Sequence, residues 1–137
     1  MLQWIQSYLR NRSQYVYYNG YTSDCRDVTC GVPQGSILGP LLFLLYINDF
    51  ALVSDKLFFL LFADDTNVFI TGKDLNKLIE TMHRELNKLS IWLSANKLTL
   101  NIYKTHFMVF HRGKWKMNTI YIKIDNSFIE QVGQFNL

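Results

Sequence analysis

The segment Lys56–Ile70, KLFFLLFADDTNVFI, places two adjacent aspartates between two short apolar runs. The runs Leu57–Phe62 and Val68–Ile70 are rich in residues that favour β-strands, so the segment predicts a hairpin with Asp64 and Asp65 at its turn. Carboxylates held at the rim of an apolar sheet are suited to bind a divalent cation. Asp is also a common turn residue without any further role, so both interpretations stay open until the neighbouring segments are considered.

Length and composition predict one folded domain, because 137 residues with 49% hydrophobic content allow a sizeable core. The most apolar stretches, Leu41–Ile47 and Leu57–Ala63, are shorter than the roughly 18 residues that span a bilayer, so we expect no membrane partner. Residues 1–12 lack the basic start and apolar block of a signal peptide. Cys25 and Cys30 with three scattered histidines do not make a zinc set, and an intracellular chain with free thiols is expected, in the cytoplasm or the nucleus.

Charge is unevenly distributed along the chain, although the net charge is only +3. Segment 86–124 contains no Asp or Glu and holds seven of the 14 basic residues. Such a segment suggests a polyanionic partner, and its residues Arg112, Lys114, Trp115 and Lys116 are candidate nucleic-acid contacts. Chance clustering on a solvated face is the alternative interpretation.

Periodicity and turn signals predict an α+β fold. The predicted helices are 1–11, 41–52 and 74–96, and the predicted strands are 12–18, 24–30, 57–62, 68–70, 105–110, 119–124 and 127–132. Helix 41–52 is apolar on nearly every side and is therefore expected to be buried, with Pro40 in its first turn. Because hairpins alternate with helices, we expect an antiparallel sheet packed on helices in a single domain, residues 1–137.

Three sequence segments, in the order in which they occur along the chain, resemble the palm of reverse transcriptases from non-LTR, LINE-type retrotransposons. Jockey-like branches of these elements are the most similar. The three segments are GVPQGSILGPLLF at 31–43, FADD at 62–65 and NKLTLNIYKTHFMVF at 96–110. WIQSYLRNRSQYV at 4–16 is also similar to a segment of this family, so the resemblance covers nearly the whole chain. It implies a right-hand polymerase fold and an RNA-directed DNA polymerase that extends a DNA primer on an RNA template with dNTPs.

The resemblance also implies roles for individual residues. Asp64 matches the aspartate that binds the two catalytic Mg²⁺ ions, with Mn²⁺ as a substitute, and Asp65 matches its neighbour. Lys104 matches the lysine near the departing pyrophosphate. The loop that packs against the template and incoming nucleotide is matched by Pro33, Gln34, Gly35 and Ser36. These roles agree with the chemistry, since two cations about 3.5–4 Å apart stabilise both the attacking and the leaving oxygen.

One residue that the family requires has no counterpart in the sequence. Polymerase palms use a further aspartate on a strand before the Pro-Gln-Gly loop, and Asp24 and Asp27 lie too close to that loop to match it. The fingers, most of the first palm strand and the thumb are also not found, so we expect this chain alone not to polymerise. Two alternatives remain: a non-catalytic nucleic-acid-binding remnant that uses Lys104–Lys116, and a truncated product without a role.

Overall fold

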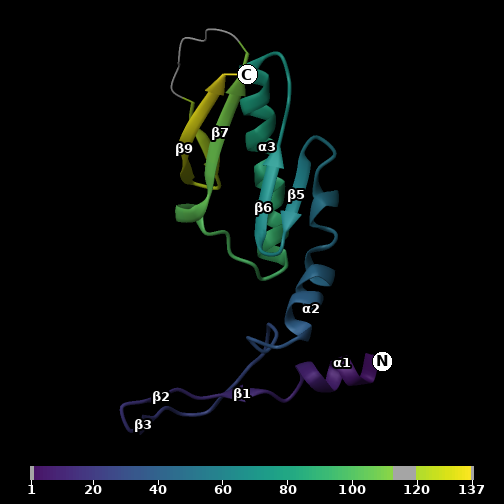
Figure 1. The fold of residues 1–137 in the computed structure, drawn as a ribbon, viewed down its shortest axis with the longest axis vertical. Coiled ribbons are helices and arrows are strands. Elements are labelled where there is room, and N and C mark those ends of the chain that lie inside the picture. Colours follow the sequence, from purple (N-terminus) through teal and green to yellow (C-terminus); the bar gives the residue numbers. More distant parts are fainter. Residues whose placement is uncertain (1, 113–119, 137) are drawn as a thin grey trace. The chain divides into compact units, whose positions relative to one another are not determined.

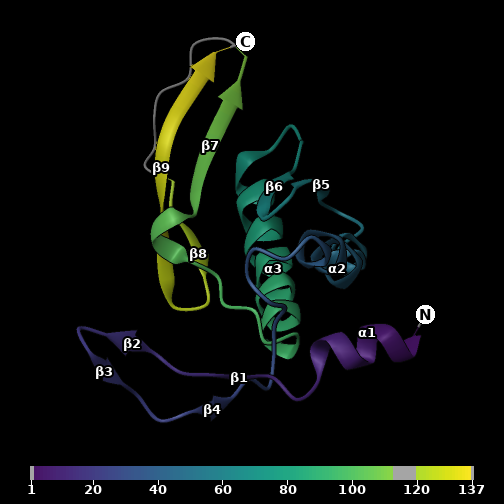
Figure 2. The same cartoon turned by 60° about the horizontal axis from the view of Figure 1, so that its bottom comes forward.

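The computed structural model of the chain describes residues 2–112 and 120–136, with side chains described as far as residue 133. Contacts between Cα atoms divide the chain into two compact units, Met1–Ile47 and Asn48–Leu137. Each unit is described by itself below, and Figures 1 and 2 show their elements. None of the helices in the described ranges is long and apolar enough to cross a membrane.

Unit 1 contains a short helix, a hairpin and a second helix. Its elements are α1 (Leu2–Leu9), β1 (Ser13–Gln14), β2 (Tyr17–Tyr18), β3 (Tyr21–Thr22), β4 (Arg26–Asp27) and α2 (Leu38–Ile47). β1 pairs antiparallel with β4, and β2 with β3. Asn19 and Gly20 join β2 to β3, and both have positive φ, as a tight hairpin turn of the type I′ kind requires. The hairpin predicted from Asn19-Gly20 is confirmed.

Helix α2 is apolar on all sides and yet largely exposed. It begins three residues earlier than predicted, with Pro40 in its first turn, and ends at Ile47. Leu41 is 55% and Leu45 66% exposed, so the prediction that this helix is buried is wrong. The physical reason lies in its own unit: among the described residues, α1 has no buried side chain, and the four short strands are exposed throughout.

Unit 2 contains most of the strands and the long helix. Its elements are the 3₁₀ helix η1 (Phe50–Val53), β5 (Phe58–Phe62), β6 (Asp65–Phe69), α3 (Leu75–Ala95), the 3₁₀ helix η2 (Ile102–Lys104), β7 (His106–His111), β8 (Ile122–Ile124) and β9 (Ser127–Asn136). Helix α3 matches the prediction within a residue at each end. Its N-cap is Asp74, whose Oδ1 accepts a hydrogen bond from the Lys77 backbone N–H at 3.2 Å.

The strands of unit 2 form two separate sheets. β5 and β6 make an antiparallel pair, and the other sheet has the order β7-β9-β8. β8 and β9 form the predicted antiparallel hairpin, but β7 runs parallel to β9. The α+β class is confirmed, whereas the prediction of one antiparallel sheet is wrong for this pair. β7 and β9 are distant in sequence, and no tight turn signals their pairing.

Helix α3 forms a layer of unit 2 against these strands, as Figure 1 shows. It contacts β8 and η1. Two hydrogen bonds tie it to the β8–β9 hairpin: Ser90 Oγ donates to Asp125 Oδ2 at 2.7 Å, and the Lys123 backbone N–H donates to His83 Nε2 at 3.1 Å. Among the residues of unit 2 whose side chains are described, the buried apolar ones are Phe50, Leu57, Leu86, Leu89, Ile120, Ile122, Ile124 and Ile129.

Candidate functional site

The candidate site is the turn of the β5–β6 hairpin. Phe62 pairs with Asp65 across the strands, which leaves Ala63 and Asp64 as a two-residue turn. Ala63 has a φ of 52°, in the left-handed region that non-glycine residues seldom adopt. The hairpin predicted from the sequence is confirmed, with Asp64 in the turn and Asp65 as the first residue of β6.

Both carboxylates are exposed at the surface of unit 2. Their oxygens are the donors that hard divalent cations such as Mg²⁺ prefer, so their chemistry fits such an ion. Among the described residues, however, no cluster of three or more His, Cys, Asp or Glu side chains could enclose a metal ion.

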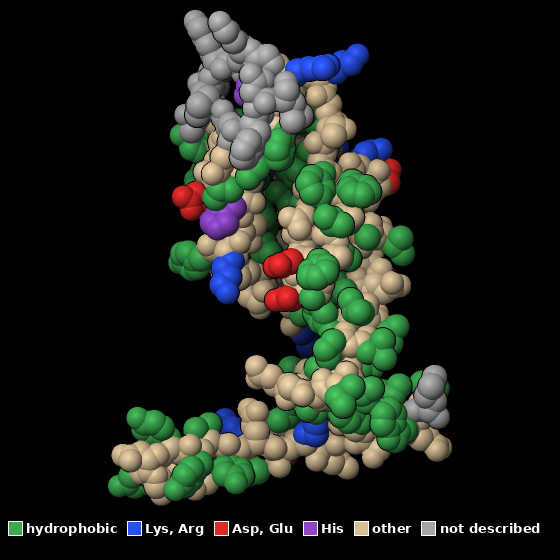
Figure 3. Space-filling model, in the orientation of Figure 1, with side chains coloured by type: hydrophobic (Ala, Val, Ile, Leu, Met, Phe, Trp, Pro, Cys, Tyr) green, Lys and Arg blue, Asp and Glu red, His purple; other side chains and the backbone are tan. Residues whose placement is uncertain are grey.

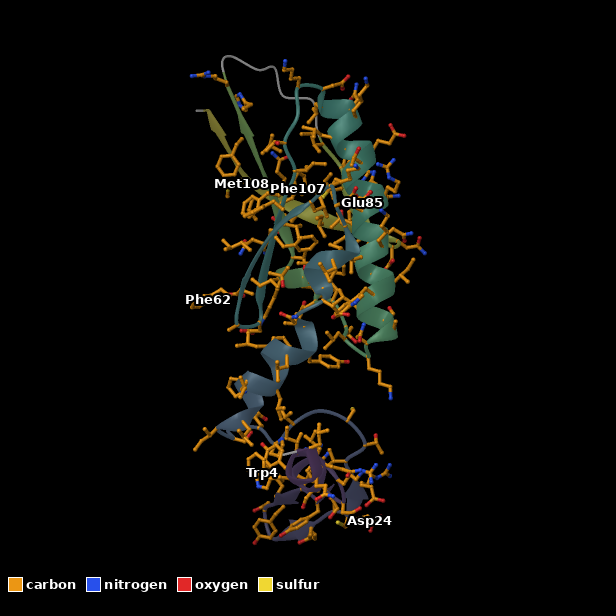
Figure 4. All side chains as sticks on the ribbon, turned by 90° about the vertical axis from the view of Figure 1, so that its right-hand side faces the viewer. Trp4, Asp24, Phe62, Glu85, Phe107 and Met108 are labelled. Atoms are coloured by element: carbon orange, nitrogen blue, oxygen red, sulfur yellow. The ribbon has the colours of Figure 1, made fainter. Side chains whose placement is uncertain are left out.

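The hairpin presents one face outward and packs the other toward α3. Phe58, Leu60 and Phe62 alternate on the exposed face, while Phe59 lies on the inner face against Phe50. The Phe50 ring in turn packs on Trp92 of α3, at a centroid distance of 4.8 Å. Figure 4 shows Phe62 projecting away from the helix at the end of the hairpin. This inner packing fixes the strand that leads to Asp64.

A buried network anchors the start of β5 to α3. Glu85, on α3, is 1% exposed, and its carboxylate accepts hydrogen bonds from Lys88 Nζ at 2.6 Å and Arg84 Nε at 3.2 Å. It also bonds to the Ser54 hydroxyl. Ser54 Oγ accepts hydrogen bonds from the backbone N–H groups of Lys56 and Leu57, the residues just before β5.

These hydrogen bonds shift the titration of Glu85. The hydrogen bond from Lys88 lowers the pKa of Glu85 most. Burial raises the pKa, but the hydrogen bonds with Ser54 and Arg84 lower it further, so that it falls from 4.5 to about 2. A glutamate on an amphipathic helix is expected to face solvent, whereas Glu85 is buried. Its spacing from Met82 and Leu89 places it on the apolar face of the helical wheel, and this signal could have identified it.

Lys104 lies in η2, just before β7, and is exposed. Its backbone N–H donates to the Asn101 carbonyl at 3.1 Å, which forms the 3₁₀ turn. On the face of unit 2 seen in Figure 3, acidic side chains lie over the turn of the β5–β6 hairpin and a basic side chain lies over η2. This face of unit 2 therefore presents both acidic and basic side chains.

The predicted template loop belongs to unit 1. Gln34 and Gly35 form a turn, in which the Ser36 N–H donates to the Pro33 carbonyl at 3.3 Å and Gly35 has a φ of 74°. Ser36 Oγ accepts a hydrogen bond from the Gly39 N–H at 3.1 Å at the start of α2. Ser36 therefore caps the helix, while Gln34 and Gly35 are exposed.

The other predicted contacts are only partly described. Arg112 is exposed just after β7, whereas Lys114, Trp115 and Lys116 lie outside the described residues. Two shallow hollows of about 310 and 380 Å³ occur elsewhere, and neither is lined by Asp64 or Asp65.

With this geometry established, comparison with known proteins identifies the family. Residues 1–131 match the family described as Reverse transcriptase (RNA-dependent DNA polymerase). The chain belongs to this family. The resemblance to reverse transcriptases of non-LTR retrotransposons, inferred from the Pro-Gln-Gly, Asp-Asp and Lys104 blocks, is confirmed.

Three relatives are named as parts of mobile elements. The chain is 26% identical to the RNA-directed DNA polymerase from mobile element jockey of Drosophila melanogaster, over 77% of this chain and 12% of that protein. It is 38% identical to the Pol polyprotein from type-1 retrotransposable element R1 of Bradysia coprophila, over 66% of this chain and 10% of that protein. It is 27% identical to the probable RNA-directed DNA polymerase from transposon BS of Drosophila melanogaster, over 95% of this chain and 15% of that protein. The chain thus spans only 10–15% of the length of these relatives. No solved structure gave a significant match.

Proposed function

We propose that residues 1–137 are part of the palm of a LINE-type reverse transcriptase and that both units belong to one domain. The position of Asp64 and Asp65 at a two-residue hairpin turn, in a chain that matches the reverse transcriptase family over residues 1–131, supports this proposal. The parent enzyme would add dNTPs to a DNA primer on an RNA template.

In this proposal Asp64 holds Mg²⁺, or Mn²⁺ in its place, and Asp65 supports the charge of the site. A bound ion stabilises the negative charge that develops on the phosphate oxygens during nucleotidyl transfer. The Lys104 ammonium neutralises or protonates the departing pyrophosphate. The loop Pro33–Ser36 brings its backbone close to the template and nucleotide, because Gly35 has no side chain to prevent that approach.

Metal binding by the full chain tests the role of Asp64. Titration with Mn²⁺, followed by electron paramagnetic resonance, should show a weak site that is lost in Asp64→Asn. Asp55→Asn is the matched control, because Asp55 is also exposed in unit 2 and pairs with Lys56 at 3.2 Å. Equal Mn²⁺ binding by wild type and Asp64→Asn would remove the metal assignment.

Primer extension tests the activity. The isolated 137-residue chain should not extend a primer, because its described residues supply only the Asp pair toward a two-metal site. A chimera with residues 1–131 in place of the corresponding segment of the jockey polymerase should extend a primer on RNA. Asp64→Asn should abolish this extension and Asp55→Asn should not. Robust extension by the isolated chain, lost in Asp64→Asn, would overturn the proposed inactivity.

A further inference from the structure

One face of the β7-β9-β8 sheet is solvent-exposed and carries large apolar side chains. Tyr121 is 62% and Phe128 58% exposed, whereas the isoleucines of β8 and β9 on the opposite face are buried. Figure 4 shows Met108 on the side of β7 away from α3. We call this side of the sheet the outer face. Its large, apolar and exposed residues, among those whose side chains are described, are Met108, Phe110, Tyr121, Phe128 and Val132.

The outer face presents a large apolar surface to solvent. A fully buried aromatic side chain covers about 150–250 Å², so three rings that are more than half exposed, together with Met108 and Val132, present roughly 500 Å². A patch of about 300–600 Å² is the largest that a typical soluble monomer exposes, and such a patch often has a function. Two copies of the outer face would offer about 1,000 Å², near the lower limit for a specific protein interface.

Four side chains at the centre of the outer face form two diagonals. Lys123 lies directly opposite Phe128 in the strand register, and the same register, continued along the two strands, places Tyr121 beside Glu130. Because residues i and i+2 of a strand point to the same side, Tyr121 and Phe128 occupy one diagonal of this square and the two charged residues occupy the other. The two rings meet edge to face across their diagonal, with centroids 5.7 Å apart and planes at 64°.

The two charges of this square have opposite signs and are accessible to solvent. Lys123 and Glu130 are the only charged residues within the strands β8 and β9. The Glu130 side chain is 76% exposed, and its Oε2 lies 3.7 Å from His106 Nδ1. The Lys123 Nζ lies 4.4 Å from the centroid of the Phe128 ring. Both charged groups can therefore reach a partner that covers the rings.

This pattern of charges fits a second copy of the chain better than another partner. An anionic partner would meet the Glu130 carboxylate, and a cationic partner would meet the Lys123 ammonium. A purely apolar segment would desolvate both charges without pairing either of them. A second outer face, turned by a half-turn about an axis along the aromatic diagonal, places its Glu130 over Lys123 and its Lys123 over Glu130.

We propose that the chain forms a weak isologous dimer through the outer face, in which Tyr121 and Phe128 pack against their copies and Lys123 and Glu130 form two equivalent ion pairs. Burial of the rings provides the attraction, and the ion pairs fix the orientation of the two copies. The dimer is independent of the proposed function, since Tyr121, Lys123, Phe128 and Glu130 have no role at the Asp64 site.

Sedimentation velocity of the full chain tests the dimer. Between about 10 and 500 μM the wild-type chain should shift from monomer to dimer, as expected for an interface of small area. Tyr121→Ala/Phe128→Ala should weaken dimerisation by at least about tenfold, because it removes the apolar centre of the interface from both copies. Tyr18→Ala/Tyr21→Ala is the matched control, because these tyrosines are also exposed on an antiparallel hairpin, and it should dimerise as wild type does.

Charge reversal tests the orientation of the two copies. Lys123→Glu alone and Glu130→Lys alone each place like charges opposite each other twice, so each should weaken dimerisation by about tenfold or more. A mixture of these two variants should form a heterodimer, because one copy then presents two acidic side chains and the other two basic ones. The double variant Lys123→Glu/Glu130→Lys should recover most of the wild-type dimerisation. Lys56→Glu is the matched control, because Lys56 is exposed in unit 2 outside this sheet, and it should leave dimerisation unchanged.

Three outcomes would overturn the proposal. A wild-type chain that stays monomeric at every concentration would leave the outer face to a different partner. Equal dimerisation by wild type and the folded Tyr121→Ala/Phe128→Ala variant would place the interface elsewhere. Failure of the folded double charge-reversal variant to recover dimerisation would exclude the twofold ion pairs. Thermal unfolding establishes that each variant is folded, and Mn²⁺ binding at Asp64 should be the same in all of them.

Discussion

The fold stabilises the charged form of Glu85. Its pKa of about 2 lies below the usual 4.5, so it contributes stability above about pH 4.5 that is lost as the pH falls toward 2. Replacing Glu85 by Gln removes charged hydrogen bonds and should lower the free energy of unfolding at pH 7 by roughly 1.5–3 kcal/mol. Urea unfolding at pH 7 and pH 3 should show that the loss of stability in acid is smaller in Glu85→Gln.

Glu80→Gln is the matched control for this prediction. Glu80 lies on the same helix but is exposed, so its replacement should change stability by less than about 0.5 kcal/mol. If Glu85→Gln and wild type lost stability in parallel between pH 7 and pH 3, another carboxylate would be responsible for the acid sensitivity.

Ala63 holds a backbone conformation at the candidate site that its side chain disfavours. Its φ of 52° costs a side-chain-bearing residue about 1–2 kcal/mol relative to glycine, and the greater entropy of glycine in the unfolded chain cancels part of this. Ala63→Gly should therefore stabilise the chain by about 0.5–1 kcal/mol in urea unfolding. Ala95→Gly, in the last turn of α3, should instead destabilise it, and stabilisation by both variants would exclude strain at Ala63 as the cause.

Helix α3 packs against β8 and η1. The N-cap of this helix makes its own contribution to stability. Asp74 Oδ1 satisfies the Lys77 N–H, so Asp74→Ala should cost about 0.5–2 kcal/mol in thermal or urea unfolding. Asp74→Asn should restore most of the loss, since an amide oxygen accepts the same bond. Asp55→Ala is a control that removes only an exposed ion pair, and an equal cost for both alanine variants would argue against capping.

Elements with a strong local signal were predictable, and pairings between distant segments were not. Helix α3, the Asn19-Gly20 hairpin and the Asp64 turn follow from spacing and turn residues that lie within a few positions of each other. The parallel pairing of β7 with β9 depends on contacts between segments far apart in sequence, so nothing local reveals it. The exposure of α2 was missed because apolar composition indicates what a helix would bury, and not what is available to cover it.

At the candidate site, too, side chains within a local motif were predictable, and side chains that meet through packing of distant segments were not. The Asp pair and Lys104 were predicted because their residue types and order match a family motif. The network at the start of β5 was not predicted, since Ser54 and Glu85 meet only when the loop before β5 packs on α3. A glutamate is usually assigned to solvent, and its burial becomes evident only from the partners that satisfy its charge.

At the scale of the whole molecule, burial is concentrated in unit 2. Of the buried apolar side chains among the described residues, Ile47 alone belongs to unit 1, and the rest lie in η1, just before β5, in α3, and in or next to the β8–β9 hairpin. Local opening is easiest where few apolar contacts are lost, so unit 1 should open at a lower free energy than α3. Native-state hydrogen exchange should therefore protect the amides of Leu86 and Leu89 far more than those of Tyr18 and Tyr21. Limited chymotrypsin digestion followed by mass spectrometry should cut first at the exposed tyrosines of β2 and β3. Equal protection in β2–β3 and α3 would mean that the two units open together, as one cooperative domain.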